Sequence, residues 1–124
     1  MMEIFGNNEH KIIHGDALEV LRTEVADGSV DLIFADPPYN IGKNFSGHKD
    51  KWDSEEDYLN WCYEWLELCV RKLKPAGSFY VMTATQFMPY FDIFLRKKNE
   101  HSFTHCLVLR QFRCSGEKIF WFDV

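Results

Sequence analysis

Four consecutive residues, Asp36, Pro37, Pro38 and Tyr39, are of types that suit the binding of a flat ring bearing an amine. Each proline fixes its own φ and pushes the residue before it into an extended conformation, so the four residues form a rigid bend. Proline also lacks an amide hydrogen, which leaves carbonyl acceptors with few competing donors beside the Asp36 carboxylate. The carboxylate and the carbonyls can hold an amino group, and the Tyr39 ring can stack on a planar partner. These residues are the first candidate for a functional site, with an ordinary strand-exit turn as the alternative.

The residues on either side of this motif predict how it is positioned. Val30–Ala35 is almost wholly apolar, which is typical of a strand in a parallel sheet covered by helices. Ligands of open α/β sheets bind outside the carboxyl ends of such strands, where the motif begins. Residues 40–52 contain two glycines and no hydrophobic period, so they predict a mobile loop anchored by Trp52.

A long helix is predicted after this loop. Ser54 precedes three acidic residues, an arrangement that caps a helix N-terminus and complements its dipole. Basic residues followed by Pro75 and Gly77 predict its end. One helical stripe predicts a face packed in the core, made of Tyr58, Trp61, Cys62, Trp65 and Cys69.

The rest of the chain continues an alternation of strands and helices. The remaining predicted elements are a strand at 11–14, a helix from residue 17, a strand at 78–82, a helix at 86–98 and a strand at 104–109. This order predicts an α/β fold in which a parallel sheet has flanking helices.

Composition and charge exclude several classes of protein. A length of 124 residues indicates one small domain or a piece of a larger one. No run approaches the roughly 18 apolar residues needed to cross a bilayer, and the first residues do not resemble a secretion signal, so we expect a cytoplasmic protein without a membrane partner. A net charge of −5 argues against a generic nucleic-acid-binding surface. The cysteines and histidines lack metal-ligand spacing, so we expect free thiols and no metal.

The motif and its flanks resemble the amino-methyltransferases of DNA, which carry D/N/S-P-P-Y/F. The run from Ser29 to Gly42 is similar to the adenine-specific, beta-group members, as are His14-Gly15-Asp16-Ala17-Leu18 and Leu73-Lys74-Pro75-Ala76-Gly77-Ser78. The likeness covers residues 10–98 and implies a Rossmann-like fold with S-adenosylmethionine as the methyl donor. It also implies double-stranded DNA as the partner, with the methyl group transferred to the exocyclic amine of a flipped adenine.

The resemblance implies a role for each residue of the motif. The Asp36 carboxylate and the Pro37 carbonyl would hold the two amine hydrogens, Pro38 would complete the rigid bend, and Tyr39 would stack on the base. Asp16 and Ala17, at a neighbouring strand end, would hold the adenine of the donor, and Asp36 would also border the donor. For Asp16, a helix cap is an equal alternative. An N-4 cytosine methyltransferase, or methyl transfer to RNA or to a protein amide, is the alternative activity.

Residues 99–124 depart from the resemblance. Residues 1–98 are predicted to be the N-terminal, catalytic-motif part of a DNA methylase domain, and residues 99–124 a frameshifted remnant of the same domain. The family leads us to expect a run like S-R-I-V-W-S-Y-D-x-S-G, which residues 99–124 lack. Codons allowed for Leu107–Arg113, if read one base later, encode W-S-Y-D-N-S-G. Lys97, Lys98 and Asn99 can be encoded by a run of adenines, where a base is easily inserted.

The family's glycine-rich donor loop is also absent from this sequence. We therefore expect an incomplete fold with an exposed sheet edge that favours aggregation or pairing, and a chain without activity on its own. The out-of-frame residues are expected to lack a proper core, namely Phe112, Phe120, Trp121 and Phe122. A non-enzymatic remnant, or a chain that binds a partner supplying the missing half, is the alternative.

Overall fold

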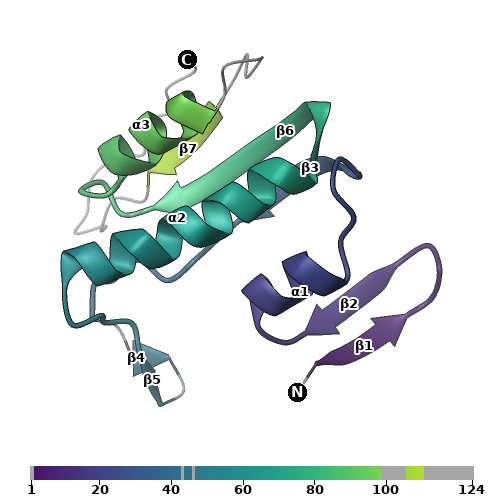
Figure 1. Cartoon of the computed structure of the whole chain (residues 1–124). Helices are drawn as coiled ribbons and strands as arrows, with labels where there is room; N and C mark the ends of the chain where they lie inside the picture. The colour runs from purple at the N-terminus through teal and green to yellow at the C-terminus, as the bar shows by residue number, and fades with distance from the viewer. Residues whose placement is uncertain (1, 43, 46, 99–105, 111–124) are drawn as a thin grey trace.

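The computed structural model describes residues 2–42, 44–45, 47–98 and 106–110. Its elements in chain order are β1 (Glu3–Gly6), β2 (Lys11–His14), α1 (Ala17–Thr23), β3 (Val30–Ala35), β4 (Asn44–Phe45), β5 (His48–Lys49), α2 (Glu55–Lys72), β6 (Leu73–Thr83), α3 (Met88–Lys98) and β7 (Cys106–Arg110). Figure 1 shows α2 lying across β6 and β3, with the hairpins β1–β2 and β4–β5 at the lower edge of the view.

Helix α2 is the centre of the core because its sequence supplies both a strong start and an apolar stripe. The Ser54 hydroxyl accepts a hydrogen bond from the Asp57 amide at 3.1 Å, which confirms the predicted N-cap. Basic residues occupy the last turn, where they complement the helix dipole. The apolar residues of α2 that are buried are Tyr58, Leu59, Cys62, Trp65, Leu66, Leu68 and Cys69. Of the predicted stripe, Trp61 is only half-buried.

A parallel sheet of order β3-β6-β7 lies against this helix. Ile33 pairs with Phe79 and Ala35 with Val81, and β6 pairs in parallel with β7. The strand predicted at 30–35 is confirmed with the same bounds, and the strand predicted at 78–82 lies inside β6. The helix predicted at 86–98 begins two residues later, as α3, and the strand predicted at 104–109 is β7.

One face of β3 meets the core and the other is open. Phe79 and Val81 of β6 are 2% and 1% exposed, whereas Leu32 and Phe34 of β3 are 57% and 55% exposed. Side chains alternate along a strand, so these two apolar residues point away from the face that α2 covers. The sheet order also leaves β3 at an edge of the described sheet. An exposed edge was predicted, and aggregation through it stays a prediction.

The strand predicted at 11–14 forms as β2, but the prediction that it joins the parallel sheet is wrong. β2 instead pairs antiparallel with β1, a strand that the sequence analysis did not predict. Gly6, at φ 115°, starts the turn, and the Asn7 side chain accepts hydrogen bonds from the Glu9 and His10 amides at 2.8 and 2.9 Å. A hairpin needs only such a short turn, whereas a parallel pair needs a long crossover, so local pairing forms here.

The segment predicted as a mobile loop, residues 40–52, contains the short antiparallel hairpin β4–β5. Within 99–124, the structure describes only β7. The residues that were expected to lack a core, Phe112, Phe120, Trp121 and Phe122, lie outside the described residues.

The two cysteines of α2 give a test of its burial. Cys62 and Cys69 are free, as predicted, and burial raises the pKa of their thiols to about 12 and about 11. Their thiolate fractions at pH 8 are therefore on the order of 10⁻⁴ and 10⁻³. In a variant carrying Cys106→Ser and Cys114→Ser, we expect no reaction with dithionitrobenzoate at pH 8 until denaturant is added. Rapid reaction of the folded variant would contradict the buried position of this helix face.

Candidate active site

The candidate site follows the carboxyl end of β3. Asp36 is exposed, while Pro37 and Tyr39 are half-buried. The Tyr39 hydroxyl donates a hydrogen bond to Oδ1 of Asp36, so the two side chains that the sequence singled out lie together. Partial burial raises the pKa of Tyr39, and the hydrogen bond to Asp36 and the charges of Asp36 and Asp50 raise it further. Tyr39 therefore remains a protonated donor at neutral pH.

The two proline carbonyls have different surroundings. The hydroxyl of Tyr58, on α2, donates to the Pro38 carbonyl at 2.6 Å, and the Tyr58 residue is 0% exposed. Burial is the main cause that raises the pKa of Tyr58, which keeps this donor protonated. Within the described residues, no hydrogen bond is made to the Pro37 carbonyl. Tyr58 thus fixes the bend from the core side and leaves Pro37 as the available acceptor.

Asp50 holds the backbone that follows the motif. Its carboxylate accepts hydrogen bonds from the amides of Tyr39 at 3.1 Å, Asn40 at 2.7 Å and Ile41 at 3.5 Å. Asp50 is only 5% exposed, so its charge is withdrawn from water and compensated by these donors. The loop is therefore held by a buried carboxylate that comes from its own far end.

A second connection crosses the same loop in the opposite direction. Asn40 has a positive φ of 56°, a conformation that asparagine tolerates better than most residues. Its side-chain oxygen accepts a hydrogen bond from the Trp52 amide at 3.0 Å. The Trp52 ring packs on α2, with its centroid 4.9 Å from that of Tyr58 and 5.0 Å from that of Trp61. The prediction that Trp52 anchors the loop is confirmed.

Asp16 and Ala17 occupy a different setting from the one expected. Asp16 is exposed and caps α1, with its Oδ1 accepting a hydrogen bond from the Glu19 amide at 3.0 Å. Both residues follow β2, which belongs to the β1–β2 hairpin and not to the sheet that contains β3. We expected β2 and β3 to be neighbours in one sheet, so that Asp16 and Asp36 would follow adjacent strand ends, but in the described residues the two strands belong to different sheets. Their binding of a methyl donor stays a prediction.

The residues that support the motif were not predicted from the sequence. Tyr58 was predicted only as core packing, and neither Asp50 nor Asn40 was given a role. Asp50 lies between two lysines in a segment without hydrophobic period, a pattern typical of a solvated loop. The one signal in the sequence was that Asp50 follows the rigid bend at Asp36–Tyr39 closely enough for its carboxylate to reach back to the amides after the bend.

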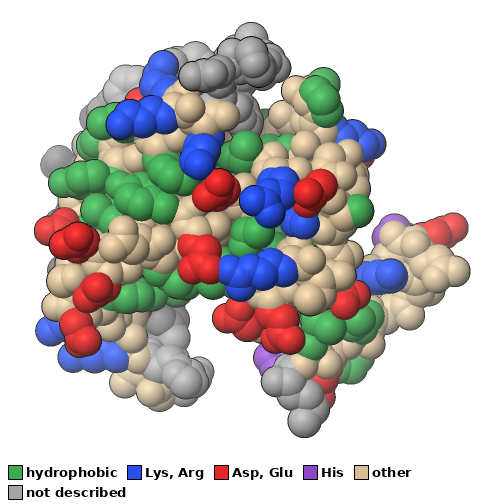
Figure 2. Space-filling view, viewed as in Figure 1, with side chains coloured by type: hydrophobic (Ala, Val, Ile, Leu, Met, Phe, Trp, Pro, Cys, Tyr) green, Lys and Arg blue, Asp and Glu red, His purple; other side chains and the backbone are tan. Residues whose placement is uncertain are grey.

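Other classes of site receive no support from the described residues. Residues 2–42, 44–45, 47–98 and 106–110 contain no cluster of three or more His, Cys, Asp or Glu that could hold a metal ion. Among the helices in this part of the chain, none is long and apolar enough to span a membrane. Figure 2 shows acidic and basic side chains interspersed on the face that carries α2.

Comparisons with known proteins point to one family. The model of a family described as DNA methylase matches residues 30–118. The chain is 52% identical over 93 residues to the DNA adenine methyltransferase YhdJ of Escherichia coli (strain K12). It is 40% identical over 89 residues to the type II methyltransferase M.BamHI of Bacillus amyloliquefaciens.

These matches cover most of the chain but a minor part of each relative. They span 75% of the chain and 31% of the E. coli protein, and 71% of the chain and 21% of the Bacillus protein. The family match includes the motif at Asp36, both prolines and Tyr39, together with Asp50 and Tyr58, which hold it. The chain belongs to the DNA methylase family.

Proposed function

We propose that this chain carries the catalytic motif of an S-adenosylmethionine-dependent methyltransferase that acts on the exocyclic amine of adenine in DNA. The observation that carries the proposal is the asymmetry of the bend. Tyr58 and Asp50 engage the Pro38 carbonyl and the amides after it, while the Asp36 carboxylate and the Pro37 carbonyl are available beside the Tyr39 ring. Two hydrogen-bond acceptors next to an aromatic face suit an amine on a planar base.

The proposed chemistry depends on the orientation of the amine. Its lone pair is delocalised into the ring, so it is a poor nucleophile. The Asp36 carboxylate and the Pro37 carbonyl each accept one of its hydrogens, which favours a pyramidal nitrogen whose lone pair is no longer delocalised into the ring and faces the methyl group. As the nitrogen–methyl bond forms and the carbon–sulfur bond breaks, positive charge develops on the nitrogen, close to the Asp36 carboxylate. The nitrogen then loses one proton to water.

The methyl donor is the second element of the proposal. When bound, S-adenosylmethionine supplies an electrophilic methyl group. Asp36 would border it, and Asp16 with Ala17 would contact its adenine. A carboxylate has two oxygens with several acceptor positions, so Asp16 can cap α1 through Oδ1 and still accept a further hydrogen bond. The Asp16 carboxylate therefore retains the capacity to accept a hydrogen bond from the adenine amine of S-adenosylmethionine.

The base must leave the duplex to reach these acceptors. Flipping costs a few kcal/mol, and stacking on an aromatic ring recovers about 1–3 kcal/mol per base. In this proposal, the Tyr39 ring supplies the stacking. Its hydroxyl contacts only one oxygen of Asp36, which leaves the carboxylate able to accept from the amine as well.

We expect Tyr39→Ala to weaken binding of the flipped base about tenfold to a hundredfold, because the stacking contribution is lost. Tyr39→Phe keeps the ring and should bind the base nearly as well as the unchanged protein. The test uses a chimera in which the matched 93 residues of this chain replace their counterparts in the E. coli enzyme. Binding is followed by the fluorescence of 2-aminopurine placed at the target position of a duplex.

The matched pair of variants makes the result decisive. An affinity for the duplex that is about tenfold to a hundredfold weaker in Tyr39→Ala, together with nearly unchanged affinity in Tyr39→Phe, would support a stacking role. Equal fluorescence and affinity in Tyr39→Ala and the unchanged chimera would show that the base does not stack on this ring.

A further inference from the structure

The Asp50 carboxylate is buried although a charged side chain in a loop is usually exposed. Three residues that are polar or charged are buried in the described structure: Asp50, Lys72 and Thr83. Lys72 has an ion-pair partner, with its Nζ 2.7 Å from Oδ1 of Asp27. Asp50 has no Lys, Arg or His within ion-pair distance in the described part of the chain. Burying a carboxylate is costly unless hydrogen-bond donors compensate its charge, and the donors that Asp50 has are the amides of Tyr39, Asn40 and Ile41.

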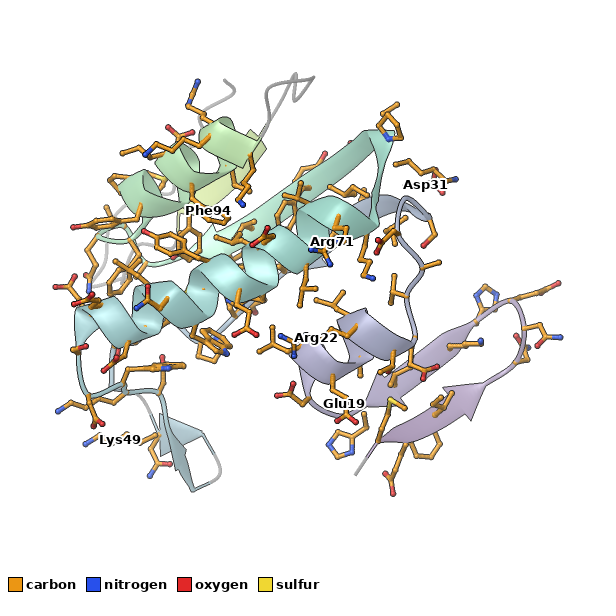
Figure 3. All side chains as sticks on the ribbon, viewed as in Figure 1. Glu19, Arg22, Asp31, Lys49, Arg71 and Phe94 are labelled. Atoms are coloured by element: carbon orange, nitrogen blue, oxygen red, sulfur yellow. The ribbon has the colours of Figure 1, made fainter. Side chains whose placement is uncertain are left out.

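The local backbone turns Asp50 inward and its neighbours outward. The Lys51 amide donates to the Lys49 carbonyl at 2.9 Å, which closes a tight turn at Asp50. Lys49 and Lys51 are exposed, and Figure 3 shows Lys49 on the β4–β5 hairpin. The Asp50 carbonyl also accepts a hydrogen bond from the Gly42 amide at 2.7 Å. Both the main chain and the side chain of Asp50 therefore close the loop onto the motif.

We propose that Asp50 is a positioning residue for methyl transfer, which acts by holding the main chain of Tyr39, Asn40 and Ile41 in the shape that directs Asp36, Pro37 and the Tyr39 ring at the base. The proposal rests on the proposed function. Asp50 contacts backbone amides and not the base, so it acts through Tyr39. The hydrogen bonds of Asp50 to these amides and of Asn40 to the Trp52 amide, called the brace below, connect the motif to the residues that follow the β4–β5 hairpin.

The role requires a carboxylate and not merely a polar side chain. Three backbone N–H groups point at Asp50, and a carboxylate accepts through both oxygens. Asparagine has almost the same shape but only one acceptor oxygen, and its amide would bring two N–H groups against these donors. Asp50→Asn therefore weakens these hydrogen bonds with little change in volume.

The first arm of the experiment does not depend on catalysis. In the 124-residue chain, amide hydrogen exchange is measured by NMR in Asp50→Asn and in Asp53→Asn, an exposed aspartate three residues further on. We expect exchange at Tyr39, Asn40 and Ile41 to become about tenfold to a hundredfold faster in Asp50→Asn, because hydrogen bonds to a charged acceptor are lost. Exchange in α2 should match that of Asp53→Asn. Unchanged exchange at these three amides would overturn the proposal.

The second arm measures kcat and KM for DNA in the chimera. We expect Asp50→Asn to lower kcat about tenfold to a hundredfold while KM changes less than about threefold, because misorientation affects the transition state more than the binding of the duplex. A general loss of stability would not produce this split. Wild-type kcat in Asp50→Asn would overturn the positioning role and leave the proposed function intact. If the unsubstituted, folded chimera transferred no methyl group, the proposed function itself would fail, and this proposal with it.

A second variant covers the case in which Asp50→Asn does not fold. Asn40→Gly suits the positive φ at this position and removes the acceptor of the Trp52 amide. It weakens the same brace from the other side, so we expect a smaller decrease of kcat, again without a matching change of KM. Unchanged kcat in a folded Asn40→Gly chimera would contradict the brace.

Discussion

Replacing Asp36 by alanine in the chimera is expected to lower the rate of methyl transfer by at least about a hundredfold, and up to about a thousandfold. The substitution removes the carboxylate that accepts an amine hydrogen and lies beside the positive charge of the transition state. It leaves the Tyr39 ring, so binding of the flipped base should change much less than the rate. Single-turnover transfer of a labelled methyl group to an adenine-containing duplex measures the effect.

Asp31 provides the matched control for this substitution. It is an exposed aspartate on the same strand, β3, and its Oδ1 lies 2.9 Å from Nζ of Lys74. Figure 3 shows it at the start of β3, at the opposite end of the view from the hairpin that carries Lys49. Asp31→Ala should therefore leave the rate close to that of the unchanged chimera. A near wild-type rate in Asp36→Ala would remove Asp36 from the proposed mechanism.

The second large effect concerns the reading frame after residue 98. We propose that residues 99–124 are the frameshifted continuation of the methylase domain, and that the gene has a run of adenines at codons 97–99. Deleting one adenine should then produce a longer protein whose next segment includes W-S-Y-D-N-S-G and, further on, a glycine-rich donor loop. The repaired protein should bind S-adenosylmethionine with micromolar affinity and methylate DNA, whereas we expect the 124-residue chain to do neither measurably.

Calorimetric titration of both proteins with the donor measures this difference. A silent recoding of the adenine run, which keeps the frame, is the control and should leave the 124-residue product and its lack of binding unchanged. The family match extends to residue 118, so the proposal requires residues 99–118 to match through their apolar pattern alone, because out-of-frame codons can still encode an apolar strand that pairs with β6. Micromolar donor affinity of the 124-residue chain, or a shifted frame without a glycine-rich loop, would contradict it.

The elements that depend on local pattern could be predicted from the sequence. The bounds of β3 follow from an apolar run between a turn and Pro37, and the start of α2 follows from the Ser54 cap. Pairing partners could not be predicted in the same way. The strand pattern of β2 is the same for a parallel or an antiparallel neighbour, and the turn at Gly6 and Asn7 decides between them.

In the candidate site, too, contacts between residues close in sequence could be predicted and long-range contacts could not. Asp36 and Tyr39 are close in sequence, so their association could be predicted from the rigid bend between them. Tyr58 reaches Pro38 across 20 residues and Asp50 reaches Asn40 across 10, and such contacts depend on how the loop folds onto α2. The sequence therefore predicts which groups would face the substrate, and the structure is needed to identify the groups that hold them.

The most direct test of the proposed function is the identity of the methylated base. DNA treated with the chimera and a labelled donor is digested to nucleosides and analysed by mass spectrometry, with the Asp36→Ala chimera as the control. The proposed function predicts N6-methyladenine in the first sample and its loss, by at least about a hundredfold, in the second. A folded, donor-binding chimera that leaves adenine unmodified, or that yields N4-methylcytosine alone, would contradict it.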